Sequence, residues 1–136
     1  MTAGPSRPKL ALLIVESQFV MRRTLVYTVQ ELQLADVTDA TNVELGRRQL
    51  ELRPFHLLII DVDPPLPVLD LIDDIRAGRT ASRPDLRIIA TLPQPHAATE
   101  QRLHELRVTD LLRKPYRAKD VLNALARPRT VAPQPA

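Results

Sequence analysis

Carboxylate, hydroxyl and ammonium side chains follow four short apolar runs of this sequence, and together these groups suit a hard metal ion and a phosphoryl group. Carboxylate oxygens are the ligands that Mg²⁺ prefers, while a lysine ammonium and a hydroxyl bind phosphate oxygens. An acidic side chain can also be the nucleophile of a group transfer. The residues are Glu16 and Ser17 after the first run, Asp61 and Asp63 after another, then Thr91, and finally Lys114 followed by Pro115.

Five apolar runs predict five strands, at residues 10–15, 36–40, 56–60, 86–90 and 108–112. Most runs are nearly continuous rather than alternating, which is typical of a parallel sheet covered on both faces. Because the carboxyl ends of parallel strands meet at one edge, we expect the polar residues above to lie together there.

Stretches of helical periodicity follow each run. One apolar helix face is formed by Met21, Leu25, Val29 and Leu32. A second is formed by Val43, Gly46 and Leu50, and its helix begins with a capping box of Thr41 and Glu44. The clearest apolar helix face is formed by Val68, Leu71, Ile72 and Ile75. Further helices are predicted at about 97–106 and 117–126. Alternating strands and helices predict an α/β fold, a doubly wound five-stranded parallel sheet with right-handed crossovers.

Length and composition predict one domain at residues 9–126. The chain has 136 residues and is 44% hydrophobic, enough to build a core. Residues 1–8 and 127–136 are rich in Pro and polar residues, and we expect a disordered leader and a disordered tail or linker stub. No apolar stretch suits a membrane span or a signal peptide, so a cytoplasmic location is expected. The absence of cysteine excludes disulfides and thiolate metal sites.

The formal charge of +3 arises from the ends of the chain. Four of the basic residues, Arg7, Lys9, Arg127 and Arg129, lie in the terminal segments, so the remaining chain is nearly neutral. With two Phe, two Tyr and no Trp there is little aromatic surface for stacking bases, and nucleic-acid binding is not expected. Arg22 and Arg23 suit either solvent or contact with a protein partner.

Four segments in order resemble the receiver domain of two-component response regulators. They are residues 13–17 (LIVES), 57–65 (LLIIDVDPP), 88–91 (IIAT) and 111–116 (LLRKPY), and the resemblance covers about residues 9–126. It implies the flavodoxin-like (βα)5 receiver fold and a role as a phosphorelay switch rather than as an enzyme.

The resemblance also implies roles for single residues. Asp61 is then the phosphoacceptor, receiving the phosphoryl group from a phosphohistidine of a sensor histidine kinase or phosphotransfer protein. Lys114 contacts the acceptor, Thr91 moves toward the phosphoryl group, and Pro115 follows a cis peptide bond. A Mg²⁺ ion is held by Glu16, by Asp61 and mainly by the backbone carbonyl of Asp63. Output to an unknown protein runs through the helix at 97–106, the strand at 108–112 and the helix at 117–126, and homodimer formation stays open.

Several positions depart from the family pattern. Ser17 stands where a second acidic ligand is usual, which weakens the predicted Mg²⁺ site, although the Asp63 carboxylate offers partial compensation. Leu111 replaces the usual switch aromatic. Leu69 and the pair at 107–108 replace small residues, and the loop after Thr91 carries extra prolines, so different loops are expected.

These departures keep a second hypothesis open, a pseudo-receiver that binds a protein partner without phosphorylation. A phosphatase or phosphotransferase using Asp61 as nucleophile is disfavoured because no general acid is evident.

Overall fold

The computed structural model describes residues 10–108 and 110–127, in which strands and helices alternate as predicted. The predicted leader and residues 128–136 of the predicted tail lie outside the described residues, whereas Arg127 is the C-cap residue of the last helix. The elements are β1 (Ala11–Val15), α1 (Phe19–Glu31), β2 (Asp36–Ala40), α2 (Val43–Leu52), β3 (Leu57–Asp61), α3 (Pro65–Arg76), β4 (Arg87–Leu92), α4 (Ala97–Glu105), β5 (Asp110–Arg113) and α5 (Ala118–Ala126).

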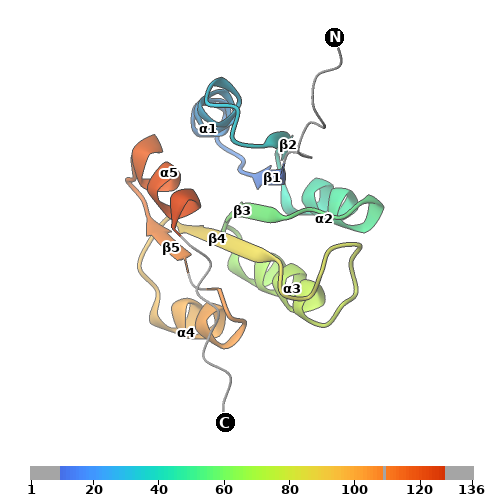
Figure 1. The fold of residues 1–136 in the computed structure, drawn as a ribbon. Coiled ribbons are helices and arrows are strands. Elements are labelled where there is room, and N and C mark those ends of the chain that lie inside the picture. The colour runs from blue at the N-terminus through green and yellow to red at the C-terminus, as the bar shows by residue number, and fades with distance from the viewer. Residues whose placement is uncertain (1–9, 109, 128–136) are drawn as a thin grey trace.

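The strands form one parallel sheet in the order β2-β1-β3-β4-β5 (Figure 1). This is the predicted doubly wound five-stranded sheet. The chain leaves β1 toward one edge and returns through β3 toward the other, so the connections diverge between these two strands. In such sheets ligands bind outside the carboxyl ends of the strands at this point of divergence.

Helices cover both faces of the sheet, with α1 and α5 on one side and α2, α3 and α4 on the other (Figure 1). Successive residues of β3 alternate between the two cores: Leu58 and Ile60 pack with the three-helix side, and Leu57 and Ile59 pack with α1 and α5. A strand buried on both faces must be apolar at every position, which explains its continuous apolar run.

Two predicted helix details are wrong. Helix α2 begins one residue later than predicted, so its cap is Asn42, whose Oδ1 accepts a hydrogen bond of 2.8 Å from the backbone N–H of Leu45, and not a Thr41 capping box. Asn at this position satisfies a free amide of the first turn just as well. Helix α1 ends at Glu31, so Leu32 leaves the apolar stripe and is 53% exposed.

Two positions that depart from the family pattern, Leu69 and Arg107, are accommodated without disrupting the neighbouring helices. Leu69 lies inside α3 and packs against the core. Arg107 adopts the left-handed conformation with φ 61°, the region that the smaller residue would favour. Among the helices of the described ranges, none has both the length and the apolar character needed to cross a membrane.

Candidate functional site

The register of the sheet brings Asp61, Thr91, Lys114 and Glu16 together at one edge. Asp61, the last residue of β3, is the register partner of Thr91 in β4. Glu16 directly follows β1, and Lys114 directly follows β5. Because all these strands point the same way, four residues distant in sequence meet at the predicted edge of the sheet.

The four side chains form a connected polar network. The Thr91 hydroxyl donates a hydrogen bond of 2.8 Å to Asp61 Oδ1. The Lys114 Nζ lies 2.9 Å from Glu16 Oε1 and 3.3 Å from Asp61 Oδ1. Glu16 is 2% exposed and Asp61 6%, so both carboxylates depend on these partners. Lys114 therefore bridges two buried anions.

The surroundings change the proton affinities of Asp61 and Lys114. Burial raises the pKa of the Asp61 carboxyl; the hydrogen bond from Thr91 opposes this, Glu16 adds to it, and Lys114 opposes it, with a raised pKa as the net result. Burial alone would lower the pKa of Lys114, but its hydrogen bond to Glu16 and the charge of Asp61 outweigh burial and raise it. Lys114 is thus held as a cation next to the predicted phosphoacceptor.

Arg22 fixes the loop that carries Glu16 and Ser17. This α1 side chain is buried, and its Nη1 donates hydrogen bonds of 3.1 and 3.4 Å to the carbonyls of Glu16 and Ser17. Its Nε binds Asp39 at 3.1 Å. The sequence leaves open whether Arg22 and Arg23 face solvent or a protein partner. Arg22 does neither, because its side chain faces inward. Its spacing from Leu25 and Val29 places it on the buried helix face, a signal that the sequence contains.

A cavity of about 240 Å³ adjoins Asp61 and contains the oxygen groups expected to hold a cation. Its lining includes Glu16, Ser17, Asp61 and Asp63, and the N-terminal end of α2 closes another side. In the part of the chain that is described, no group of three or more His, Asp or Glu side chains is arranged to hold a metal ion. The donor set is all oxygen and suits Mg²⁺, but with two buried carboxylates it offers a weak site.

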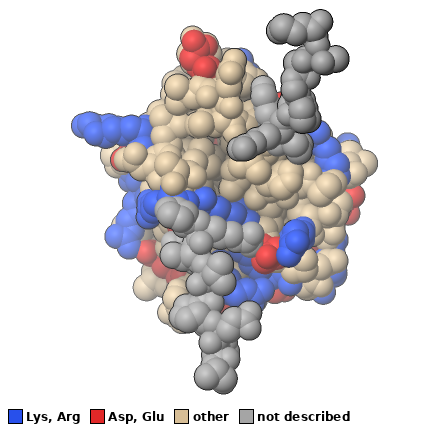
Figure 2. All heavy atoms as spheres, viewed as in Figure 1, with Lys and Arg blue, Asp and Glu red and all other residues tan. Residues whose placement is uncertain are grey.

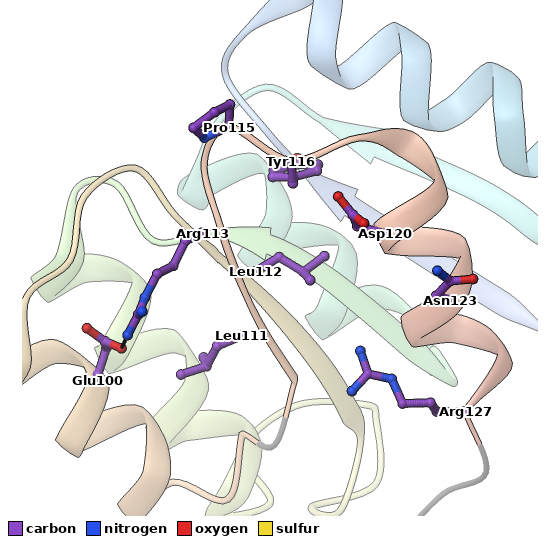
Figure 3. A pocket seen from close by; sticks show the side chains of 9 residues that line it. All are labelled: Glu100, Leu111, Leu112, Arg113, Pro115, Tyr116, Asp120, Asn123 and Arg127. Carbon is purple, nitrogen blue, oxygen red and sulfur yellow. Dashed lines mark hydrogen bonds and ion pairs between the residues drawn. The ribbon is translucent and has the colours of Figure 1, made fainter.

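A second, larger pocket of about 460 Å³ lies over β5 between α4 and α5, and we call it the β5 pocket (Figure 3). Glu100 and Arg113 form an ion pair of 2.5 Å at one end, and side chains of α5 line the other. Leu111 lies in the β5 pocket, at the position of the missing switch aromatic. The lining comprises Glu100, Leu111, Leu112, Arg113, Pro115, Tyr116, Asp120, Asn123 and Arg127.

Tyr116 lines this pocket, and the sequence gives it no role beyond its place after Lys114 and Pro115. The aromatic ring is buried in the core between the sheet and α5.

The predicted cis peptide bond before Pro115 is confirmed, and a second one precedes Pro64.

The surface carries charges of both signs. On the face shown in Figure 2, basic side chains form separate groups interspersed with acidic and uncharged ones.

Solved structures similar to this one are receiver domains. A response regulator receiver protein from Pseudomonas putida is 27% identical, with a TM-score of 0.75 over 86% of this chain and 95% of that one. Chemotaxis protein CheY4 of Vibrio cholerae is 18% identical, with a TM-score of 0.74 over 86% and 96%. The beryllofluoride-activated DrrB receiver domain is 18% identical, with a TM-score of 0.72 over 86% and 94%. By sequence, neither a protein-family model nor a curated protein matches the chain.

The chain therefore has the fold of response-regulator receiver domains. The flavodoxin-like (βα)5 fold and the resemblance that the sequence predicts are confirmed.

Proposed function

We propose that this receiver-like chain is a phosphorylation switch in which Asp61 accepts a phosphoryl group from a phosphohistidine of a sensor histidine kinase or phosphotransfer protein. The observation that carries the proposal is the position of Asp61, buried at the point where the connections diverge and contacted by both Lys114 and Thr91. A structural carboxylate at a strand end has no need of this combination of partners.

The chemistry follows from these partners. An Asp61 oxygen attacks phosphorus as the N–P bond of phosphohistidine breaks, and the imidazole leaves with a proton from solvent. Two anions repel, and the Lys114 ammonium at 3.3 Å reduces that repulsion. The Thr91 hydroxyl, which donates to Asp61 Oδ1, would donate to a phosphoryl oxygen on Asp61. Glu16, Asp61 and mainly the backbone carbonyl of Asp63 would hold Mg²⁺, which supplies further positive charge to the phosphoryl oxygens when bound.

Phosphorylation of Asp61 would change the affinity of this chain for another protein. We assign the output surface to α4, β5 and α5, where the β5 pocket lies (Figure 3). Glu100 and Arg113 join α4 to the end of β5, directly before Lys114. A displacement of Lys114 would thus be transmitted to this surface.

A pseudo-receiver is the second candidate function, and one observation favours it. Lys114 already pairs with both Glu16 and Asp61, and Ser17 contributes no charge to the cavity. Each buried carboxylate therefore has a cationic partner without a metal ion, and a chain that binds no metal ion would bind its partner constitutively.

Beryllofluoride, which mimics a phosphoryl group on aspartate, distinguishes the two. We expect its titration with Mg²⁺ to give saturable amide shifts at Asp61, Thr91 and Lys114 by NMR. Asp61→Asn should abolish them, whereas Asp70→Asn, which changes an exposed carboxylate of α3, should not. Absence of shifts at high Mg²⁺ would reject the phosphoacceptor function and favour the pseudo-receiver.

A further inference from the structure

The phenol of Tyr116 is the feature of this structure that the proposed function leaves unused. Tyr116 is 9% exposed, and its hydroxyl is the one buried side-chain polar atom without a hydrogen-bond partner in residues 10–108 and 110–127. Burying a hydroxyl without a partner is unfavourable. An unpartnered buried polar group calls for an explanation, and a partner that becomes available in another state of the protein is one.

Thr91 is the hydroxyl group that acts on the Tyr116 phenol. Burial raises the pKa of the Tyr116 phenol, and the charges of Glu16 and Asp61 raise it further, whereas the Thr91 side chain lowers it. The phenol thus interacts electrostatically with the polar network, while its hydroxyl has no hydrogen-bond partner.

Thr91 has the capacity to bind both neighbours. A threonine hydroxyl donates one hydrogen bond and has two acceptor lone pairs. Its single hydrogen is directed to Asp61 Oδ1 at 2.8 Å, which leaves Oγ1 free to accept from Tyr116. A phosphoryl group on Asp61 presents new acceptor oxygens further from β3, so the Thr91 hydroxyl must reorient to reach one of them.

Tyr116 also lines the β5 pocket, together with Leu112 and Asp120 (Figure 3). A change at its hydroxyl is therefore connected to a surface of the protein through one rigid ring. Leu111 lines the same pocket but has no polar atom with which to sense Thr91.

We propose that Tyr116 is a positioning residue that couples Asp61 to the β5 pocket: its hydroxyl donates a hydrogen bond to Thr91 Oγ1 when Thr91 binds a phosphoryl group on Asp61. The proposal rests on the proposed phosphoacceptor function. It assigns the coupling to the loop between β5 and α5, beyond the strand that carries Leu111.

Tyrosine labelled with ¹³C at Cζ provides a direct test, because this carbon reports hydrogen bonding of the phenol. The chain has two tyrosines, and Tyr27 on α1, which is 64% exposed, serves as the internal reference. We expect beryllofluoride with Mg²⁺ to shift the Tyr116 signal and to leave the Tyr27 signal in place.

Removal of one oxygen gives the matched functional test. Tyr116→Phe should weaken beryllofluoride binding about fivefold, the effect of one hydrogen bond, without lowering stability in its absence, since no bond is lost there. Tyr27→Phe should change neither quantity. A merely structural Tyr116 would show the opposite pattern, lower stability with unchanged binding.

The outcomes separate this inference from the proposed function. Saturable binding at Asp61 with an unmoved Tyr116 signal, or with unchanged affinity in Tyr116→Phe, would overturn the coupling and leave the phosphoacceptor function intact. No binding to the wild-type protein would reject both.

Discussion

Ser17 brings a neutral hydroxyl into a cavity whose other oxygen groups include the buried carboxylates of Glu16 and Asp61. Lys114 binds both carboxylates, so a metal ion has to compete with an ammonium that is already in place. At the scale of single residues, the balance between the two cations depends on how much negative charge the cavity holds.

Ser17→Asp is expected to tighten Mg²⁺ binding by about tenfold or more, because a further carboxylate adds both a ligand and a charge. Isothermal titration with Mg²⁺ measures the change. Ser17→Asn is the matched control, since it has the same shape as Asp and a neutral oxygen. Equal tightening in both variants would show that charge is not what the site lacks.

Asp61→Asn is expected to raise the free energy of unfolding at pH 7. The folded protein raises the pKa of this carboxyl, mainly through burial, so it favours the neutral form that Asn imitates. The wild-type protein has the full benefit of a protonated Asp61 below the ordinary pKa of 3.8 and loses it as the pH rises through the higher folded pKa.

The difference between Asp61→Asn and wild type should therefore shrink as the pH falls toward 3.8. Urea unfolding at several pH values measures it, with exposed Asp70→Asn as control. A destabilised Asp61→Asn at pH 7 would mean that the bond to Lys114 outweighs the cost of burial.

The sequence predicts the site residues that follow strands, and it does so because parallel strands bring their carboxyl ends to one edge. Asp61 and Thr91 are register partners for this reason. Arg22 is different: its spacing from Leu25 and Val29 indicates that it faces inward, but the backbone carbonyls that it binds are located only by the structure. The unpartnered hydroxyl of Tyr116 is likewise a property of three-dimensional packing.

At the scale of elements, apolar periodicity predicts which segments form strands and helices but not the residues at which they end. Strand β4 reaches Leu92, two residues beyond its apolar run, because pairing with β5 continues there. The start of α2 depends on which of two neighbouring polar residues takes the cap, and here Asn42 does. Such ends are decided by one or two hydrogen bonds, which composition does not reveal.

Gly46 determines how closely α2 approaches β1. A Cβ atom at this position would lie 2.7 Å from Cγ2 of Val15, a buried side chain directly before Glu16. Alanine normally stabilises a helix interior by about 1 kcal/mol over glycine. Here the collision reverses that sign, because core overpacking costs about 1 to 3 kcal/mol.

We therefore expect Gly46→Ala to lower the free energy of unfolding, measured in urea. The double variant Gly46→Ala/Val15→Ala should lose less than the two single variants together, since removing the Val15 methyls removes the collision. Strict additivity would show that α2 shifts freely on the sheet. A stabilised Gly46→Ala would contradict the predicted collision altogether.

At the scale of the whole molecule, one sheet is shared by two separate cores. The core on the side of α2, α3 and α4 and the core on the side of α1 and α5 meet only through the strands (Figure 1). The Asp61 site takes Glu16 and Asp61 from neighbouring strands and Lys114 from the far edge, so its geometry requires both layers of helices to be in place.

Leu58 and Ile59, adjacent in β3, face opposite cores and are almost fully buried. Leu58→Ala and Ile59→Ala should each lower the free energy of unfolding by about 2 to 5 kcal/mol. Leu66→Ala, at a side chain 73% exposed, should change it by less than about 0.5 kcal/mol. Because β3 belongs to both cores, each variant should still unfold in one transition, with circular dichroism and methyl signals from both faces lost at the same urea concentration. If methyl signals of one face disappeared first, the two layers would be independently stable, and the Asp61 site could be dismantled by loosening either layer alone.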